Sequence, residues 1–293
     1  MTTPRLGLSD LNGLPPQDFV AALGQAFEHA PWVAEEVVGR RPFATVTALH
    51  DAMMDAVRRA PPGQQLALIG GHPELGSRVR RADMTDASQA EQGSLGLDRL
   101  SADEFDRFSK LNGAYREKFG FPFIVCVRRH TRDSILRQFK QRLGNHVDAE
   151  RARALDEIGH ITRLRIVGLV DGPGAPKTDG RLSTHVLDNV AGRPAKGVKI
   201  TLHEIGASAR GFLGEWITNA DGRTDAPLIA GEPLRIGRYE LSFHVGEYFA
   251  RAGASEPPFL DVVPVRFAIA DAEGHYHVPL LATPWSYTTY RGS

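Results

Sequence analysis

A ten-residue segment rich in glycine and proline divides the chain into two halves with different sequence patterns. Residues 171–180 read DGPGAPKTDG and lack the apolar periodicity of a helix or a strand, which is typical of a linker. The chain has 293 residues, so each half is long enough to bury its own hydrophobic core. We therefore expect two domains, at residues 1–171 and 181–293, joined by a linker at residues 172–180.

The first half shows the periodicity of amphipathic helices, and the second half that of short strands. Ser101 with Glu104 three residues later forms a capping-box pattern at the start of one helix. Further helices are expected from Pro15-Pro16 onward and at residues 43–60, 135–143 and 150–170. Strands separated by Gly, Asp, Asn and Pro are expected at residues 182–187, 198–204, 211–218, 239–249, 262–270, 276–281 and 285–290. The pattern predicts an all-α N-terminal domain followed by an all-β sandwich domain.

Charge and cysteine content exclude several classes of partner. Lys and Arg together number 35, as do Asp and Glu, so the formal net charge is zero. Nucleic acids and anionic membranes favour a basic excess, and we expect neither as a partner. The single cysteine, Cys126, allows no intrachain disulfide and lies in the apolar run FPFIVCV, where we expect a buried structural thiol. Without a membrane-length apolar run or a signal-peptide pattern, the expected location is the cytoplasm.

Two histidines near the C-terminus are predicted to share one face of a strand. His275 and His277 are two residues apart, and side chains at this spacing point to the same side of a sheet. Pro279 cannot donate to a β-ladder, which predicts a sheet edge, a strand end or a bulge. The residues alone leave three interpretations open for the histidines: ordinary surface groups, metal ligands, or an acid–base pair.

Two further residues of the second half are candidates for the same chemistry. His185 lies in the first expected strand, on the face that Ser183 and Leu187 share, and Arg223 directly follows an Asp-Gly turn. A neutral imidazole can activate water near neutral pH. A guanidinium can bind a planar anion and stabilise an oxyanion.

Three segments resemble the transthyretin-like 5-hydroxyisourate hydrolases: LSTHVLD at residues 182–188, TNADGR at 218–223, and HYHVPLL with the terminal YRGS. The resemblance implies a transthyretin-like sandwich without metal or cofactor, and a tetramer formed through this domain with active sites between dimers. It assigns catalysis to His185, Arg223 and His277, with His275 as a possible helper. It assigns substrate binding to the tail residues Tyr290, Arg291, Gly292 and Ser293.

The first half has its own polar candidates. Pro73 restricts the preceding His72 to extended backbone geometry. Ser88 and Glu91 fit a helix start, with Ser88 as the N-cap. Arg165 falls on the apolar stripe of the last helix, where it needs a partner or a ligand, whereas Arg163 is expected to be solvated.

GGHPELG, the downstream SxxEQ, FPFI and the end of the last helix resemble 2-oxo-4-hydroxy-4-carboxy-5-ureidoimidazoline (OHCU) decarboxylase over residues 8–170. The resemblance implies a cofactor-free decarboxylase, with His72 as the proton-transferring residue and Glu91 as its partner. Substrate binding is assigned to Pro73, Ser88, Ile124 and Arg165.

The two resemblances name consecutive reactions, because the product of the hydrolase is the substrate of the decarboxylase. The expected function is conversion of 5-hydroxyisourate through OHCU to (S)-allantoin by one chain. Two alternatives remain: a transthyretin-type carrier of small molecules with a helical adaptor domain, and a metal-dependent hydrolase of another cyclic amide. Sequence alone leaves open whether the intermediate is channelled between the sites.

Overall fold

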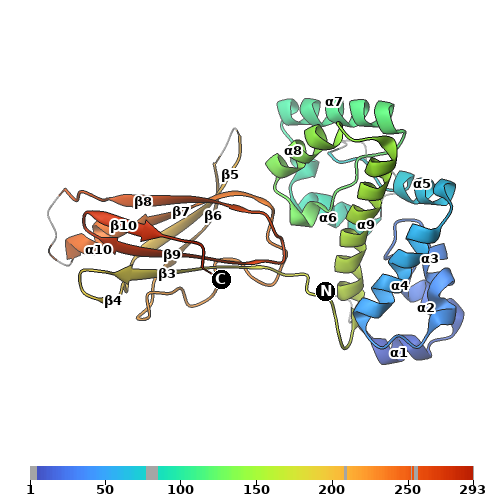
Figure 1. The fold of residues 1–293 in the computed structure, drawn as a ribbon, viewed down its shortest axis with the longest axis horizontal. Helices are drawn as coiled ribbons and strands as arrows, with labels where there is room; N and C mark the ends of the chain where they lie inside the picture. The colour runs from blue at the N-terminus through green and yellow to red at the C-terminus, as the bar shows by residue number, and fades with distance from the viewer. Residues whose placement is uncertain (1–4, 77–84, 208–209, 252, 254–256, 293) are drawn as a thin grey trace. The chain divides into compact units, whose positions relative to one another are not determined.

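The computed structural model describes residues 5–76, 85–207, 210–251, 253 and 257–292 (Figure 1). These residues form two compact units. The helical unit comprises residues 5–128 and 135–178, and the strand unit comprises residues 129–134 and 179–292. Each unit has a separate hydrophobic core.

The helical unit packs its helices around α9, which spans Val147–Leu169. The other helices are α1 Leu8–Gly13, α2 Pro16–Leu23, α3 Trp32–Val37, α4 Val46–Arg59, α5 Pro62–Gly70, α6 Asp86–Ser94, α7 Ala102–Phe119 and α8 Arg132–Arg142, with 3₁₀ turns at Val38–Arg40, Leu97–Arg99 and Val127–Arg129. Two short strands, β1 Leu6–Gly7 and β2 Val170–Asp171, pair in parallel. The helical prediction is confirmed for this half, although α1, α3, α5 and the β1–β2 pair were not predicted.

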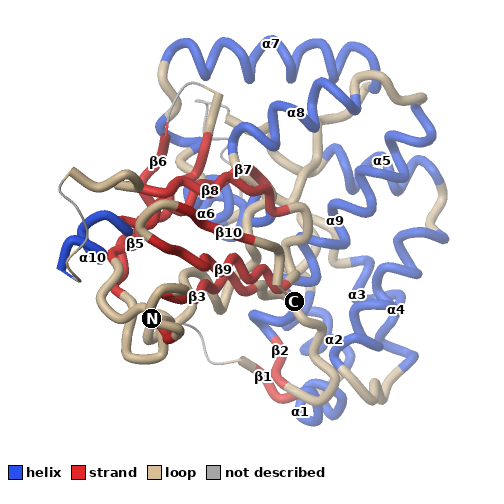
Figure 2. The backbone as a smooth tube through the Cα atoms, turned by 60° about the vertical axis from the view of Figure 1, so that its left-hand side comes forward, coloured by secondary structure: helices blue, strands red, loops and turns tan. Residues whose placement is uncertain are grey.

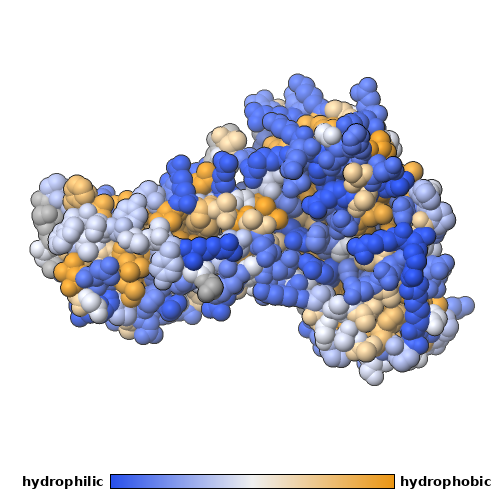
Figure 3. Space-filling view, in the orientation of Figure 1, coloured by the Kyte–Doolittle hydropathy of each residue, from blue (hydrophilic) through white to orange (hydrophobic). Residues whose placement is uncertain are grey.

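Local sequence explains where these helices begin. The capping box is present at α7, where Ser101 Oγ accepts from the Glu104 amide at 3.3 Å and Glu104 Oε2 accepts from the Ser101 amide at 2.9 Å. Pro62 ends the preceding apolar pattern but also begins α5, because proline is well tolerated in the first turn of a helix. The visible outer face of α7 is mostly hydrophilic in Figure 3. Its buried residues recur every three or four positions: Phe108, Asn112, Tyr115 and Phe119.

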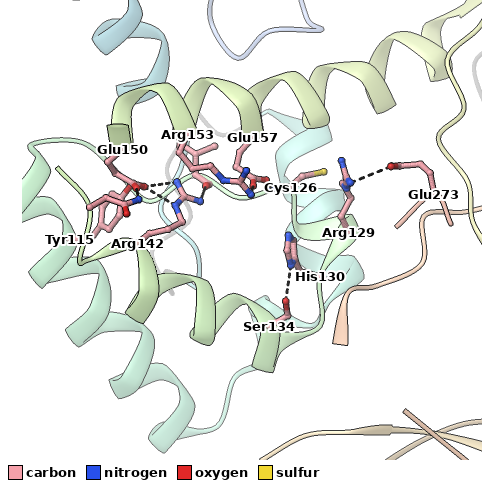
Figure 4. Close-up of polar contacts among 12 residues, drawn as sticks. Tyr115, Cys126, Arg129, His130, Ser134, Arg142, Glu150, Arg153, Glu157 and Glu273 are labelled. Atoms are coloured by element: carbon pink, nitrogen blue, oxygen red, sulfur yellow. Dashed lines mark hydrogen bonds and ion pairs between the residues drawn. The ribbon is translucent and has the colours of Figure 1, made fainter. Parts of the chain in front are cut away.

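An irregular buried segment, residues 121–127, connects α7 to α8, and side chains satisfy part of its backbone. The Ile124 carbonyl accepts from Arg142 Nη1 at 2.8 Å, and the Cys126 amide donates to Glu157 at 2.9 Å (Figure 4). Cys126 itself is 2 % exposed, which confirms the prediction of a buried thiol. Because buried backbone groups need hydrogen-bond partners, these side chains stabilise a loop that itself forms no α-helix or strand.

A buried polar cluster centred on Glu150 anchors this support. The carboxylate accepts from Tyr115 Oη, from Arg142 Nε at 2.7 Å and from Asn145 Nδ2 at 2.6 Å (Figure 4). Burial and the adjacent carboxylate raise the pKa of Tyr115, so its hydroxyl stays protonated and donates. The guanidinium of Arg142 also stacks 4.4 Å from the ring centroid of Phe123. The cluster thus joins α7, α8 and α9 to the 121–127 segment.

The strand unit is a sandwich of two four-stranded sheets, with strand orders β10-β9-β3-β4 and β6-β5-β7-β8 (Figure 2). The strands are β3 Arg181–Asp188, β4 Arg193–Pro194, β5 Lys199–Ile205, β6 Arg210–Ile217, β7 Gly237–His244, β8 Val262–Ile269, β9 His275–Thr283 and β10 Ser286–Thr289. Among the described strands of these two sheets, β3 and β9 pair in parallel and the other pairs are antiparallel. Both sheets contribute to one core, which confirms the predicted sandwich.

The predicted strand at residues 239–249 is only half correct. Strand β7 ends at His244, and a seven-residue helix, α10, spans Val245–Arg251. Val245 and Phe249 are both buried, and their four-residue spacing places them on one helical face. The second domain is therefore a sandwich with one short helix. The sequence did not reveal the change, because no proline or glycine separates the end of the strand from Val245, the apolar residue that begins the helix.

Pro279 was expected at a sheet edge, a strand end or a bulge, and it instead lies inside β9, between β10 and β3. The β10 ladder stops at Leu280 paired with Thr289, and a single bridge pairs His277 with Gly292 further on. The register is the same on both sides of this gap, so no bulge forms. The missing amide proton of Pro279 falls in the gap, which explains the interruption.

Within the described residues, no helix is long and apolar enough to cross a lipid bilayer.

The Glu150 cluster gives a stability prediction. Replacing Glu150 with Ala leaves Arg142 buried and without its carboxylate, and we expect the free energy of unfolding of the helical unit to fall by about 3–5 kcal/mol. Urea unfolding followed by far-ultraviolet circular dichroism, which is dominated by the helices, measures this change. The control is Asp156→Ala, which breaks an exposed ion pair with Arg58 and should cost less than about 1 kcal/mol. Equal losses in the two variants would contradict the role given to the cluster.

Candidate active sites

His72 follows α5 and presents an unprotonated nitrogen to a small cavity. Its Nδ1 lies 2.9 Å from the Leu68 carbonyl, which can only accept, so Nδ1 carries the proton. Nε2 is buried and has no hydrogen-bond partner among the described residues. Burial lowers the pKa of His72 to about 4, which keeps the ring neutral at physiological pH. The residue is therefore a buried base with one nitrogen available.

The cavity beside His72 has a volume of about 30 Å³. The structure brings together here all six residues that the sequence predicts for this site: His72, Pro73, Ser88, Glu91, Ile124 and Arg165. Gln92, Phe123, Val125 and Val127 line it as well and were not predicted. This volume is far below the roughly 300–1,000 Å³ of a typical small-molecule pocket, so binding a substrate requires the cavity to widen.

The prediction that Ser88 caps α6 is wrong. The N-cap is Thr85, whose Oγ accepts from the Ser88 amide at 3.3 Å, and Ser88 lies within the first turn. The Ser88 hydroxyl instead donates to Glu28 at 2.8 Å and accepts from Arg165 Nη2 at 3.1 Å. Because Ser88 and Glu91 are three residues apart on a helix, both side chains face Arg165.

Arg165 is the buried centre of this site. Its Nε and Nη2 donate to the two carboxylate oxygens of Glu91 at 2.9 and 2.8 Å, and its Nη1 donates to Glu28 at 2.9 Å. Burial alone lowers the pKa of Arg165, but the two carboxylates outweigh burial and raise it. The prediction that this arginine needs a partner is confirmed. Arg163 was expected to be solvated, and it is instead half-buried, with its Nε atom buried, and does not line the cavity.

Sequence reasoning missed Glu28, which lies in the turn between α2 and α3 and is fully buried. No motif surrounds it in the sequence. The apolar stripe that contains Arg165 predicts some acidic partner, but nothing in the sequence identifies Glu28 as that partner.

In the strand unit, β3 and β9 place three polar side chains in contact. Burial alternates along β3, with Leu182, Thr184 and Val186 inside, as predicted. The parallel register sets Ser183 opposite His277. Ser183 Oγ lies 3.0 Å from Nδ1 of His277 and 3.2 Å from Nε2 of His275. Ser183 was not predicted as a site residue, although the strand alternation places it on the face of His185.

A tight loop brings Arg223 to the same face. The Asn219 side chain accepts from the Asp221 amide at 3.0 Å and the Arg223 amide at 3.2 Å. Gly222 has φ of +70°, and its carbonyl accepts from the Val186 amide at 2.8 Å. A Cβ at Gly222 would lie 2.3 Å from the Val186 carbonyl oxygen, so only glycine allows this approach. The loop therefore docks onto β3 beside His185.

The electrostatics of the strand unit keep two imidazoles neutral. Burial, then the positive charge of Arg223, lowers the pKa of His185. Burial, Arg223 and the neighbouring histidines likewise lower the pKa of His277. Nε2 of His185 is buried and has no hydrogen-bond partner among the described residues. The predicted trio of His185, Arg223 and His277 is thus close enough to interact within one chain.

The C-terminal tail contributes unevenly to this site. The Gly292 amide donates to the His277 carbonyl at 2.9 Å, and a Cβ at Gly292 would lie 2.7 Å from the His277 ring. Arg291 instead stacks 4.8 Å from the ring centroid of Tyr276, on the other face of β9, and Tyr290 is 57 % exposed. Ser293 lies outside the described residues.

Within the described residues, no group of three or more His, Cys, Asp or Glu side chains is arranged to hold a metal ion.

Comparisons with known protein families agree with this division. The family model "OHCU decarboxylase" matches residues 12–167, and the model "HIUase/Transthyretin family" matches residues 182–292. The chain belongs to both families, one in each half, which confirms the two resemblances seen in the motifs.

Individual relatives match each half and the whole chain. A 5-hydroxyisourate hydrolase from Deinococcus radiodurans is 56 % identical over 113 residues, which cover 38 % of this chain and 95 % of that protein. A 2-oxo-4-hydroxy-4-carboxy-5-ureidoimidazoline decarboxylase from Haloferax volcanii is 43 % identical over 161 residues, which cover 55 % of this chain and 94 % of that protein. The crystal structure of an (S)-allantoin synthase, 35 % identical, covers 98 % of this chain and 100 % of its own, with a TM-score of 0.53.

The neutral imidazoles of the strand unit can be tested by chemical modification. Diethyl pyrocarbonate reacts with neutral imidazole, so the modification rate of each histidine against pH reports its pKa. We expect His185 and His277 to react with midpoints below 6.5, the ordinary pKa of histidine. Removing the positive charge in Arg223→Gln favours the protonated ring and should move both midpoints upward. Peptide mass spectrometry resolves the individual sites.

The control for this experiment is Arg238→Gln, which removes an exposed charge from β7. It should leave both midpoints unchanged. A midpoint at or above 6.5 in the wild type, or equal shifts in the two variants, would contradict the electrostatic interpretation.

Proposed function

We propose that this protein carries out two consecutive reactions. The strand unit hydrolyses 5-hydroxyisourate to OHCU, and the helical unit decarboxylates OHCU to (S)-allantoin. The observation that carries the proposal is that one chain belongs to both enzyme families, each matched over nearly its whole unit. Membership of the decarboxylase family also favours two enzymes over a carrier with an adaptor domain, because an adaptor needs no second catalytic site.

For the hydrolase, we propose that a neutral imidazole of the pair His185 and His277 removes a proton from water. The water attacks the carbonyl carbon of the cyclic amide-like bond, and Arg223 stabilises the oxyanion that forms. The protonated imidazole then returns the proton to the leaving nitrogen as the carbon–nitrogen bond breaks. The lowered pKa values of both imidazoles support this role, because a general base must be unprotonated at the working pH.

For the decarboxylase, we propose that Arg165 binds the substrate carboxylate and that His72 moves one proton. The carbon–carboxylate bond breaks, carbon dioxide leaves, and the ring accepts the electron pair and takes up one proton from solvent at nitrogen. Nε2 of His72 accepts the hydroxyl proton as the new carbonyl forms and delivers it to the ring carbon. Because the imidazole of His72 lies on one side of the substrate, the proton reaches one face of the ring carbon and a single enantiomer of allantoin forms. The neutral, buried His72 supports this assignment.

We further propose that the strand unit assembles into a tetramer and that Tyr290, Arg291, Gly292 and Ser293 contribute to substrate binding there, as the family resemblance implies. Large apolar side chains on the strand unit support an interface: Phe212, Ile217 and Trp285 are 62 %, 63 % and 64 % exposed. We also retain residues 1–171 and 181–293 as the domain boundaries.

The test supplies the purified protein with freshly generated 5-hydroxyisourate. We expect its decay to exceed the spontaneous rate and the allantoin to show the circular dichroism of one enantiomer. The variant His277→Ala should lose hydrolysis by about 100-fold or more and keep decarboxylation, and His72→Ala should do the reverse, since general acid–base catalysis contributes at least this much.

A suitable control is His146→Ala, because His146 is exposed and makes no side-chain cap bond at the start of α9. It should retain both activities. Spontaneous decay giving racemic allantoin in the wild type would refute the proposed function. Loss of both activities in one well-folded histidine variant would refute the independence of the two sites.

A further inference from the structure

Arg165 has no hydrogen-bonding edge left for a substrate in this state of the protein. Its Nε and Nη2 form a two-pronged pair with Glu91, and its other edge is shared by Glu28, bound to Nη1, and Ser88, bound to Nη2. A substrate carboxylate needs the same two-pronged geometry that Glu91 now occupies. One of the two glutamates must therefore leave the guanidinium when the substrate binds.

The two glutamates differ in how firmly they are held. The side chain of Glu28 is 0 % exposed and that of Glu91 is 18 % exposed. Glu28 accepts from the Thr85 hydroxyl at 2.8 Å, the Ser88 hydroxyl at 2.8 Å and the Thr85 amide at 3.4 Å, besides Arg165. The Glu91 carboxylate has hydrogen bonds to Arg165 alone among those described. Glu91 is thus the partner that can be exchanged.

Charge favours the same exchange. The cavity holds one guanidinium and two carboxylates beside a neutral His72, and an anionic substrate adds a third negative charge. Like charges repel strongly where burial removes water. Movement of Glu91 toward solvent relieves this repulsion and also widens the narrow cavity. Glu28 cannot move in the same way, because its donors come from α6 and α9 together.

We infer that Glu28 is a positioning residue for the decarboxylase: it stays bound to Arg165 and holds the guanidinium toward the cavity while the substrate carboxylate replaces Glu91. The inference rests on the proposed function of the helical unit. Glu28 also ties the α2–α3 turn to the first turn of α6 through Thr85 and Ser88. Arg165 therefore keeps its direction although one of its two ion pairs opens.

The test compares a ligand that carries the carboxylate with one that lacks it. In Glu28→Gln the neutral amide no longer anchors Arg165. We expect this loss to outweigh the relief of charge repulsion, so that the KM for OHCU rises by about tenfold, in line with loss of one charge-assisted hydrogen bond. The kcat should change much less than KM. Inhibition by allantoin, the product without a carboxylate, should stay within about twofold, because Arg165 has no anion to bind in it.

Two further variants complete the design. Glu28→Asp keeps the charge and shortens the side chain by one methylene, so its KM should lie between those of the wild type and Glu28→Gln. Glu36→Gln removes an exposed charge from the nearby helix α3 and should match the wild type. If Glu28→Gln does not fold, Glu28→Asp decides by the same two measurements.

The inference is overturned if Glu28→Gln leaves KM within twofold of the wild type, if KM and the allantoin inhibition constant rise together, or if only kcat falls. A general collapse of the cavity would weaken both ligands equally. Failure of the proposed function is a different result, because the wild-type protein would then not turn over OHCU at all.

Discussion

The requirement that buried polar groups find partners organises the helical unit. Arg165 lies on the buried face of α9 and stays there because two carboxylates surround its guanidinium. The same helix carries Glu150 and Glu157, which support the irregular 121–127 segment directly or through Arg142. One wall of the cavity is therefore a loop whose shape depends on charged side chains outside the cavity. In this unit the interactions that stabilise the fold are also those that shape the candidate site.

In the strand unit, the equivalent constraint is the parallel pairing of β3 with β9. It places strands from the two ends of the domain side by side, with Ser183 opposite His277. The close approach of Gly222 to β3 then adds Arg223 to the same face. Three segments distant in sequence thus meet. The register of β3 with β9 fixes two of them, and the close approach of the Gly222 turn to β3 fixes the third.

The two candidate sites use the same physical device. Each holds an imidazole neutral through burial, and each leaves an Nε2 atom buried without a partner among the described residues, at His72 and at His185. Each also places a guanidinium nearby. They differ in the fate of that guanidinium, since Arg165 is enclosed by carboxylates and Arg223 is exposed on a loop. The enclosed Arg165 suits a substrate that displaces Glu91 from it. The exposed Arg223 suits a site to which other groups are added on assembly.

Local patterns in the sequence determined the two-part division, the helical and strand character of each part, the capping box at Ser101 and the strand faces of His185 and His277. These features depend on residues a few positions apart, whose periodicity and turn chemistry are local properties. Only the tertiary structure decided three other features. Thr85, and not Ser88, caps α6, and the chain forms helix α10 directly after strand β7. Glu28 is the second partner of Arg165. Those outcomes depend on groups up to 137 residues apart along the chain, whose competition for buried hydrogen bonds is settled only by packing.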